Sequence, residues 1–297
     1  MFNNVLVGVD GRPSGRDAIA LARQLAEPEG RLTFANVYGG SYRLAYAGAA
    51  GFVRAEREAA GTLLQQARTE SGVDARLISV EAPAPGRGLH EQAEDQEADL
   101  LVLGSCSHRG VLGRVALGDD TRAAVDGASC AVAIAPHGYA QTAKPFASIG
   151  VGYDGSEESQ AAVEVAKLLA QASAARVHAM RVVSLPTYLF MGVVPPVGPT
   201  IEEMTKEARD EMQELGVDEV SAHHGLAGEE LAGLSSNVDL LIVGSRGYGP
   251  MRRLVLSSTS NYLQHHCRGP LLVLPRGTRY AHVEAEDGKT AMSSVSA

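Results

Sequence analysis

Glycines and hydroxyl residues follow a short apolar run in the second half of the chain, and their spacing suits an anion. Residues 240–243 lead into Gly244 and Gly247, and nine residues separate Gly247 from Ser257-Ser258-Thr259. A buried strand that ends in glycines and then meets a helix start directs several backbone N–H groups to one place. The helix dipole adds positive potential there. The spacing predicts a phosphate site, without the lysine of a Gly-Lys-Ser/Thr phosphate loop.

The chain contains the same pattern twice. Residues 7–11 recur as 151–155, residues 99–105 as 239–245, and residues 131–136 as 270–275, each about 140 residues later. Three blocks in the same order indicate a duplicated domain of the usual size. We expect one domain over residues 1–140 and a second over 145–276, with the boundary in 137–145. The last segment, 277–297, is polar and small, which predicts disorder.

Composition limits the class of protein. The chain is 45% apolar and 21% charged, which is enough to build a core in each half. No apolar run approaches the ~20 residues of a membrane span, and the N-terminus opens directly into a strand without a leader, so no membrane partner is expected. Cys106, Cys130 and Cys267 lack disulfide or metal spacing, which predicts a cytoplasmic location. The formal charge of −9 argues against nucleic acid as a partner.

Strands and helices alternate along each copy. The strands are nearly continuous apolar runs, which indicates burial on both faces and a parallel sheet. In the first copy Ser14, followed by Asp17, resembles a helix-capping pair. The sequence therefore predicts an α/β fold: two tandem Rossmann-like domains, each a five-stranded, mainly parallel open sheet sandwiched by helices. Ligand is expected where the strand order reverses. The expected strands are 4–9, 32–37, 75–80, 100–103, 131–135, 148–153, 176–183, 217–222, 240–243 and 271–274.

Three blocks carry a resemblance to a known family. Val-Gly-Tyr-Asp-Gly-Ser at 151–156, Asp-Leu-Leu-Ile-Val-Gly-Ser-Arg-Gly-Tyr-Gly at 239–249 and Cys-Arg-Gly-Pro-Leu-Leu-Val-Leu-Pro at 267–275 resemble the universal stress protein family. The resemblance covers both copies, about residues 1–275. It implies a tandem member of the actinobacterial type, with domains of the HUP-type Rossmann-like fold.

The resemblance also implies adenine nucleotide binding, with ATP as the expected ligand, with or without Mg²⁺. Nucleotide-binding members resemble a Gly-x-x-Gly, nine-residue, Gly-Ser/Thr pattern with an Asp at the first strand's end. Asp154 would accept from ribose hydroxyls or the adenine amine, Val182 would offer backbone groups to adenine, and Arg246 would neutralise phosphate. Ser257 stands where the family has glycine, and a positive φ there would cost about 1 kcal/mol. The expected second-copy residues are Asp154, Val182, Val243, Gly244, Arg246, Gly247, Ser257, Ser258 and Thr259.

The first copy departs further from this pattern. Ser107 replaces the second glycine, and Gly118 is followed by Asp119 and Asp120 instead of hydroxyl residues. Carboxylates satisfy helix N–H groups themselves and repel phosphate by about 1–3 kcal/mol each. We expect a weaker or lost site here, and nearer one nucleotide than two per chain. The corresponding residues are Asp10, Val37, Leu103, Gly104, Ser107 and Gly118.

The sequence shows no nucleophile–base pair and no cluster of metal ligands. In the pairs His223-His224 and His265-His266, neighbouring side chains point in different directions, so neither pair chelates. We expect a cytoplasmic stress-response protein, not an enzyme, whose conformation or partner choice is biased by adenine nucleotide. The alternatives are a nucleotide-independent interaction module, a slow ATPase or autophosphorylating protein, and a hydrolase or phosphotransferase. Terminal sheet edges are expected to pair within the chain as a pseudo-dimer, and a homodimer is also expected.

Overall fold

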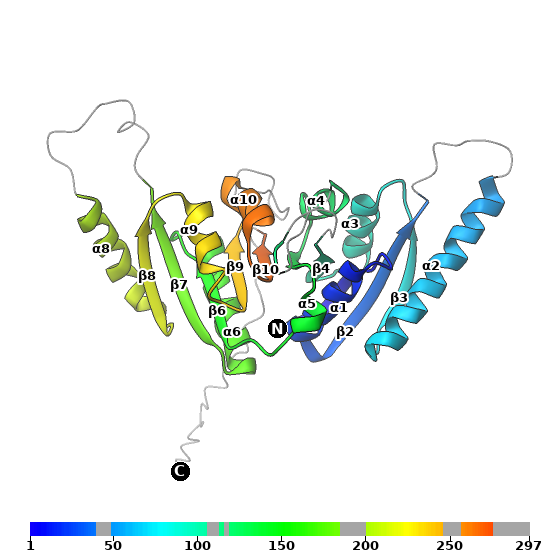
Figure 1. Cartoon of the computed structure of the whole chain (residues 1–297), viewed down its shortest axis with the longest axis horizontal. Helices are drawn as coiled ribbons and strands as arrows, with labels where there is room; N and C mark the ends of the chain where they lie inside the picture. Colours follow the sequence, from blue (N-terminus) through cyan, green and yellow to red (C-terminus); the bar gives the residue numbers. More distant parts are fainter. Residues whose placement is uncertain (40–48, 106–112, 116–118, 185–199, 246–256, 276–297) are drawn as a thin grey trace, which may run out of the picture.

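A computed structural model describes residues 1–39, 49–105, 113–115, 119–184, 200–245 and 257–275. The first half alternates strands and helices. Its elements are β1 (Phe2–Gly8), α1 (Pro13–Leu25), β2 (Ala26–Tyr38), α2 (Ala49–Ser71), β3 (Arg76–Glu81), α3 (Pro85–Asp95), β4 (Leu100–Gly104), α4 (Asp119–Val125) and β5 (Ala131–Ala135). The short helix α5 (Tyr139–Thr142) links the halves (Figure 1). The predicted tail, 277–297, lies outside the described residues.

The second half repeats this order. Its elements are β6 (Ser148–Gly152), α6 (Glu157–Ser173), β7 (Arg176–Val183), α8 (Ile201–Met212), the 3-10 turn η1 (Gln213–Leu215), β8 (Glu219–His224), α9 (Ala227–Leu234), β9 (Leu240–Gly244), α10 (Ser258–His266) and β10 (Leu271–Leu274). All pairs within a half are parallel, in the order β3-β2-β1-β4-β5 and its equivalent β8-β7-β6-β9-β10. The predicted fold class is confirmed. The order reverses between β6 and β9, where ligand was expected.

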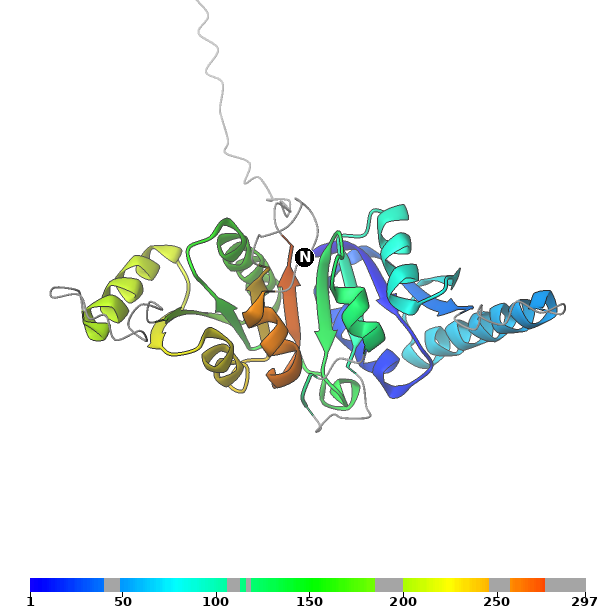
Figure 2. The ribbon, with the colours of Figure 1, turned by 90° about the horizontal axis from the view of Figure 1, so that it is seen from above.

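The two halves share one sheet. Strand β5 pairs antiparallel with β10, with Ala133 opposite Leu272, so ten strands run continuously across the molecule (Figures 1 and 2). Among the described residues, two further hydrogen bonds cross this seam: Val115 N–H donates to the Cys267 carbonyl (3.0 Å), and Arg122 Nη2 donates to Asn261 Oδ1 (3.2 Å). The edge strands that would otherwise invite association therefore pair within the chain.

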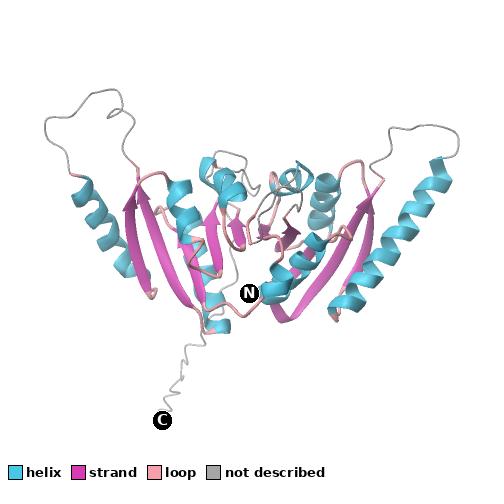
Figure 3. Ribbon diagram, in the orientation of Figure 1, coloured by secondary structure: helices cyan, strands magenta, loops and turns pink. Residues whose placement is uncertain are grey.

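Helices cover both faces of this sheet (Figure 3). Along β4, Leu100 and Val102 pack in the core under α1, while Leu101 and Leu103 pack in the core under α3 and α4. In the second half, α6 lies on the first face and α9 and α10 on the other. Successive side chains point to opposite faces, so burial of both faces accounts for the unbroken apolar strands.

The capping pair expected at the start of α1 is wrong. The N-cap residue is Arg12, whose side chain makes no capping hydrogen bond to the helix. Pro13 takes the first helical position because its fixed φ suits the first turn. Ser14 Oγ instead donates to the Asp10 carboxylate at 3.2 Å. Asp17 accepts from the backbone N–H groups of Gly138 and Ala140, both at 2.8 Å. Asp17 therefore ties α1 to the linker between the two halves.

The aspartate before the fourth strand of each copy anchors the first strand. Asp99 accepts from the N–H groups of Asn3 (2.7 Å) and Asn4 (3.0 Å). Asp239 accepts from Ala147 N–H (2.9 Å) and Ser148 N–H (3.0 Å), and pairs with Lys144 Nζ (3.0 Å). Burial raises the pKa of Asp99 despite its hydrogen bonds. Burial also acts on Asp239, but the Ala147, Lys144 and Ser148 hydrogen bonds outweigh it and lower its pKa.

These shifts predict opposite pH dependence for two matched variants. Asp239 is worth more to the native state above the ordinary Asp pKa of 3.8, and its contribution is lost as pH falls through its lowered pKa. Asp99 contributes more below 3.8 and less as pH rises through its raised pKa. At about pH 7, Asp239→Asn should lose about 1–3 kcal/mol of unfolding free energy in urea titrations.

Asp239→Asn should have a lower free energy of unfolding than wild type, and this difference should shrink toward about pH 3. The corresponding difference for Asp99→Asn should grow over the same range. Equal slopes for the two variants would contradict these assignments.

Candidate functional site

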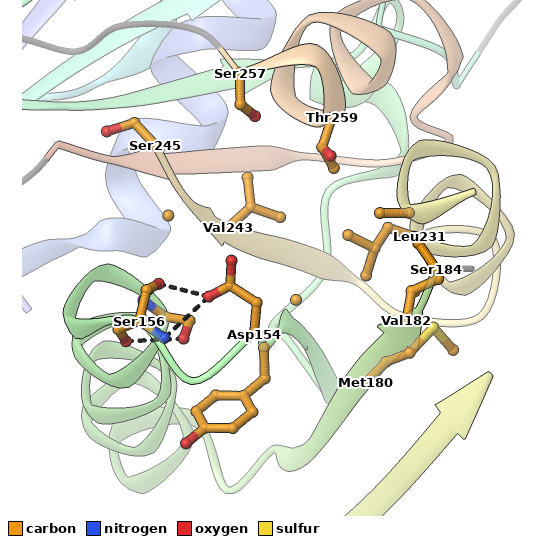
Figure 4. A pocket seen from close by; sticks show the side chains of 15 residues that line it. Asp154, Ser156, Met180, Val182, Ser184, Leu231, Val243, Ser245, Ser257 and Thr259 are labelled. Carbon is orange, nitrogen blue, oxygen red and sulfur yellow. Dashed lines mark hydrogen bonds between the residues drawn. The ribbon is translucent and has the colours of Figure 1, made fainter. Parts of the chain in front are cut away.

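A hollow opens at the carboxyl ends of β6, β7 and β9, beside the first turns of α9 and α10 (Figure 4). One side of it is polar, with carboxyl and hydroxyl groups, and the other side is apolar. Its lining residues are Gly152, Tyr153, Asp154, Ser156, Ser159, Met180, Val182, Ser184, Ala227, Leu231, Val243, Gly244, Ser245, Ser257 and Thr259. It lies at the reversal of strand order, where open α/β sheets bind ligands.

Asp154 follows β6, and Figure 4 shows its carboxyl group pointing into the space bordered by Val243. The turn after it needs glycine, because Gly155 has φ +85°. Asp154 Oδ1 accepts from the backbone N–H of Ser156 (3.1 Å) and from its hydroxyl (2.5 Å). Ser156 also caps α6, where its Oγ accepts from Ser159 N–H at 3.2 Å. The carboxylate is thereby held in place by the chain that follows it.

Gly244 is needed for packing. A Cβ on Gly244 would lie 2.6 Å from the Cβ of Glu158, on the first turn of α6. The next N–H group, that of Ser245, donates to the Leu274 carbonyl at 2.8 Å. The idea that the amides after the strand all turn toward an anion is therefore wrong for Ser245, because its N–H extends the sheet. Arg246 and Gly247 lie outside the described residues.

The start of α10 borders the polar side of the hollow. Ser257 is its N-cap, with φ −69°, and its Oγ accepts from Ser260 N–H at 3.0 Å. The strain considered for a serine at this position is therefore absent, because the backbone does not adopt positive φ. Ser257 and Thr259 line the hollow, whereas Ser258 is exposed and does not. The first N–H groups of the helix have no partner within it, which favours an anion nearby.

The apolar side contains an exposed stretch of backbone on β7. Tyr153 N–H donates to the Met180 carbonyl at 2.9 Å, and the pairing of β6 with β7 ends there. Gly225 N–H donates to the Val183 carbonyl at 3.2 Å from the other side. Along a strand, residues two positions apart direct their N–H and C=O groups to the same side. The N–H and C=O of Val182 therefore point to the same side of β7 as the Met180 carbonyl, toward the hollow that Val182 lines. Among the described residues no strand pairs with them there.

The sequence missed several lining residues. Met180, Ser184, Ala227 and Leu231 border the hollow with Val182, and Tyr153 and Ser156 flank Asp154. Their positions follow from topology: the residue after β7 and the first turn of the helix after β8 must reach the crevice at the reversal point. No motif marks them, because their roles rest on shape rather than on a special residue type.

In the first copy, the equivalent carboxylate is engaged differently. Asp10 accepts from Arg12 N–H (3.0 Å), both its oxygens accept from Ser14 Oγ (3.2 Å), and Arg12 Nε lies 4.0 Å away. Val37 lines a separate hollow between β2 and α2, with Asn36 and Tyr38. Leu103 is buried, and a Cβ on Gly104 would lie 2.0 Å from the Ser14 carbonyl oxygen. Ser107 and Gly118 lie outside the described residues.

One histidine of each adjacent pair has a side-chain partner in the structure. His223 Nδ1 lies 3.2 Å from Glu230 Oε2, and the His266 ring stacks on Tyr262 with centroids 3.9 Å apart. Burial lowers the pKa of His265, and Arg122 and His266 lower it further. Within the described part of the chain, no group of three or more His, Cys, Asp or Glu residues is arranged to hold a metal ion.

The structure consists of two copies of one α/β unit, and the second copy has a hollow where the strand order reverses. Both copies also match one known family in sequence. The sequence profile of the universal stress protein family fits residues 1–136 and again 145–275. The chain belongs to the universal stress protein family.

Curated universal stress proteins of mycobacteria are similar to this chain. A universal stress protein of Mycobacterium tuberculosis is 33% identical over 184 residues, which is 60% of this chain and 62% of that protein's length. One of Mycolicibacterium smegmatis is 30% identical over 190 residues, with the same shares. These matches thus span less than two thirds of the curated relatives' length.

Solved structures share the tandem fold. A universal stress protein from Archaeoglobus fulgidus superposes with a TM-score of 0.63 at 16% identity, covering 93% of this chain and 97% of that one. At this identity the likeness speaks for the fold alone. Among the described residues, none of the helices has the length and apolar character that crossing a bilayer requires.

Proposed function

We propose that this universal stress protein binds an adenine nucleotide, ATP, in the hollow of its second copy. The observation that carries the proposal is the pairing of two features across one hollow. The N–H and C=O groups of Val182, which have no strand partner among the described residues, lie on its apolar side, and the Asp154 carboxylate lies on its polar side. A nucleotide has a flat, mostly apolar base at one end and hydroxyl and phosphate groups at the other, so it fits this division.

The backbone of Val182 favours adenine over other purines. Adenine presents an amine donor at position 6 beside a ring acceptor at position 1. The Val182 carbonyl would accept from the amine, and its N–H would donate to the ring nitrogen. Hypoxanthine and guanine carry a carbonyl at position 6 and an N–H at position 1, which places acceptor against acceptor and donor against donor. Because Asp154 holds the ribose, the base cannot turn over to restore the match.

The phosphates would lie against the start of α10. Ser257 and Thr259 supply hydroxyls, and the first N–H groups of the helix supply the positive end of its dipole. In this proposal Arg246 supplies positive charge to the phosphates, and Gly247 lets the backbone come close to them. Any Mg²⁺ would arrive with the nucleotide and bind mainly through phosphate oxygens and water, as that ion usually does.

In this proposal the protein is a cytoplasmic binding protein of the stress response and not an enzyme. Bound nucleotide would bias its conformation or its choice of partner, through different affinities for two states. The first copy would bind nucleotide weakly or not at all, because Arg12 and Ser14 engage Asp10 and acidic residues open α4. A homodimer of the tandem chain is part of the same proposal.

Calorimetric titrations with ATP and inosine triphosphate test this function. ATP should bind with a stoichiometry near one per chain. Inosine triphosphate should bind about 30-fold more weakly or worse, because a buried mismatch leaves two backbone groups unsatisfied. Equal affinity for both, or no heat with millimolar ATP, would contradict the proposal.

A further inference from the structure

An exposed leucine stands beside the hollow without a structural reason to be there. Leu226 has 64% of its surface exposed and is the N-cap of α9, with no hydrogen bond from its side chain to the helix. Ser, Thr, Asp or Asn at this position would stabilise the helix by about 1 kcal/mol. Leu226 therefore neither packs in the core nor caps, and local rules tend to be broken at functional sites.

The backbone of Leu226 is firmly held. Glu229 N–H and Glu230 N–H donate to its carbonyl at 3.0 and 3.1 Å. The preceding residue, Gly225, donates its N–H to the Val183 carbonyl, and its own carbonyl accepts from Ser184 Oγ, both at 3.2 Å. These bonds hold the backbone on both sides of Leu226, and both Ser184, which bonds Gly225, and the next residue, Ala227, line the hollow. An apolar side chain thus extends from a rigid point at its rim.

We propose that Leu226 covers the heterocyclic base of the bound ligand and sets the affinity of the site for purines. The inference rests on the proposed function. The neighbouring wall is apolar, built by Met180, Ala227 and Leu231, so the base lies on this side of the hollow. Leu226 would then lose part of its exposed surface when the base is seated, and the apolar area removed from water stabilises the complex.

The first copy offers a natural comparison. Leu231 of α9 and Leu89 of α3 occupy matching places, each against the glycine that ends the first strand, Gly152 and Gly8. Counting back from them, Leu226 matches Ala84, the N-cap of α3. Alanine lacks the reach to cover a base. The first copy therefore lacks this element of the site, and its Asp10 carboxylate accepts from Arg12 N–H and Ser14 Oγ.

Titration of the full chain with ATP, adenosine and inorganic triphosphate tests the inference. Leu226→Ala should weaken ATP and adenosine alike, by about tenfold, because half-burying a leucine is worth about that much. Inorganic triphosphate should bind equally to wild type and variant. Leu226→Met should keep most of the affinity. The melting temperature should not change, because leucine and alanine are both poor N-caps.

Matched controls separate the possible failures. Ala84→Leu in the first copy should leave the affinity of the second-copy site unchanged. If wild type binds ATP and Leu226→Ala binds it equally well, the inference is overturned while the proposed function stands, and Leu226 then faces another partner. A loss that is as large for inorganic triphosphate also overturns it. No binding of ATP or adenosine to wild type overturns both.

Discussion

Asp154→Ala should weaken ATP binding by about 50-fold, whereas Asp10→Ala should leave it unchanged. Charge-assisted hydrogen bonds to a carboxylate contribute about 1.5–3 kcal/mol each, and removal of the acceptor leaves ribose hydroxyls unpaired in the hollow. The two aspartates occupy equivalent turns, each followed by a glycine with positive φ, +85° at Gly155 and +74° at Gly11. The comparison therefore separates ligand contact from local folding. Isothermal titration of both variants at one ionic strength measures it.

Asp154→Asn refines this prediction. In the wild type, the N–H and hydroxyl of Ser156 donate to Asp154 Oδ1. Asparagine keeps one oxygen that can accept these bonds and removes the charge. It should retain more affinity than alanine but less than wild type. If Asp10→Ala weakens ATP binding as much as Asp154→Ala does, the site is in the first copy or in both, and the assignment to the second copy is wrong.

Gly104→Ala should be among the most damaging small substitutions in the chain. The added Cβ would lie 2.0 Å from the carbonyl oxygen of Ser14 and 2.5 Å from its carbonyl carbon. These are backbone atoms of α1, so the helix must move away from β4. We expect a loss of about 3 kcal/mol or more, and a melting temperature lower by roughly 5–10 °C.

Gly61→Ala is the matched control for this prediction. Gly61 lies within α2, and a Cβ there would meet no atom within 4 Å. Alanine should stabilise this helix by about 0.5–1 kcal/mol, because glycine loses more backbone entropy on folding. Differential scanning calorimetry compares the two variants. A melting temperature unchanged by Gly104→Ala would show that α1 does not approach β4 as closely as described.

Much of the fold follows from the sequence because it depends on patterns that repeat. Nearly continuous apolar runs required strands with both faces buried, and the repeated blocks required two units. The order of the strands was not predicted; the sequence predicted only that ligand would lie where that order reverses. The contacts of single polar side chains cannot be predicted from repeated patterns. Asp17 resembles a helix cap, yet it binds the N–H groups of Gly138 and Ala140, over 120 positions away.

The site was predictable in part for the same reason. Asp154, Val182, Val243, Gly244, Ser257 and Thr259 do meet around one hollow, since each ends a strand or begins a helix at the same edge of the sheet. The amide of Ser245 was not predictable as a sheet donor, because its partner, Leu274, comes from β10. The backbone conformation of Ser257 could not be read from the sequence: the cost considered there applies only at positive φ, and Ser257 has φ −69°.

The seam between the copies, where β5 pairs with β10, connects the proposed nucleotide site to the first copy. Helix α10 has hollow residues at its start, Asn261 further along and Cys267 as its C-cap; Asn261 and Cys267 contact Arg122 and Val115 of the first copy. A ligand that repositions the start of α10 would act on those contacts. Any such effect requires a difference in affinity between the two arrangements of the seam.

A crystal structure of the protein grown with ATP tests whether the second-copy hollow is the nucleotide site. We expect one nucleotide per chain, with the base against the backbone of Val182, the ribose on Asp154 and the phosphates at the start of α10. ATP bound instead in the first copy, or a second-copy hollow that stays without nucleotide at millimolar ATP, would contradict it.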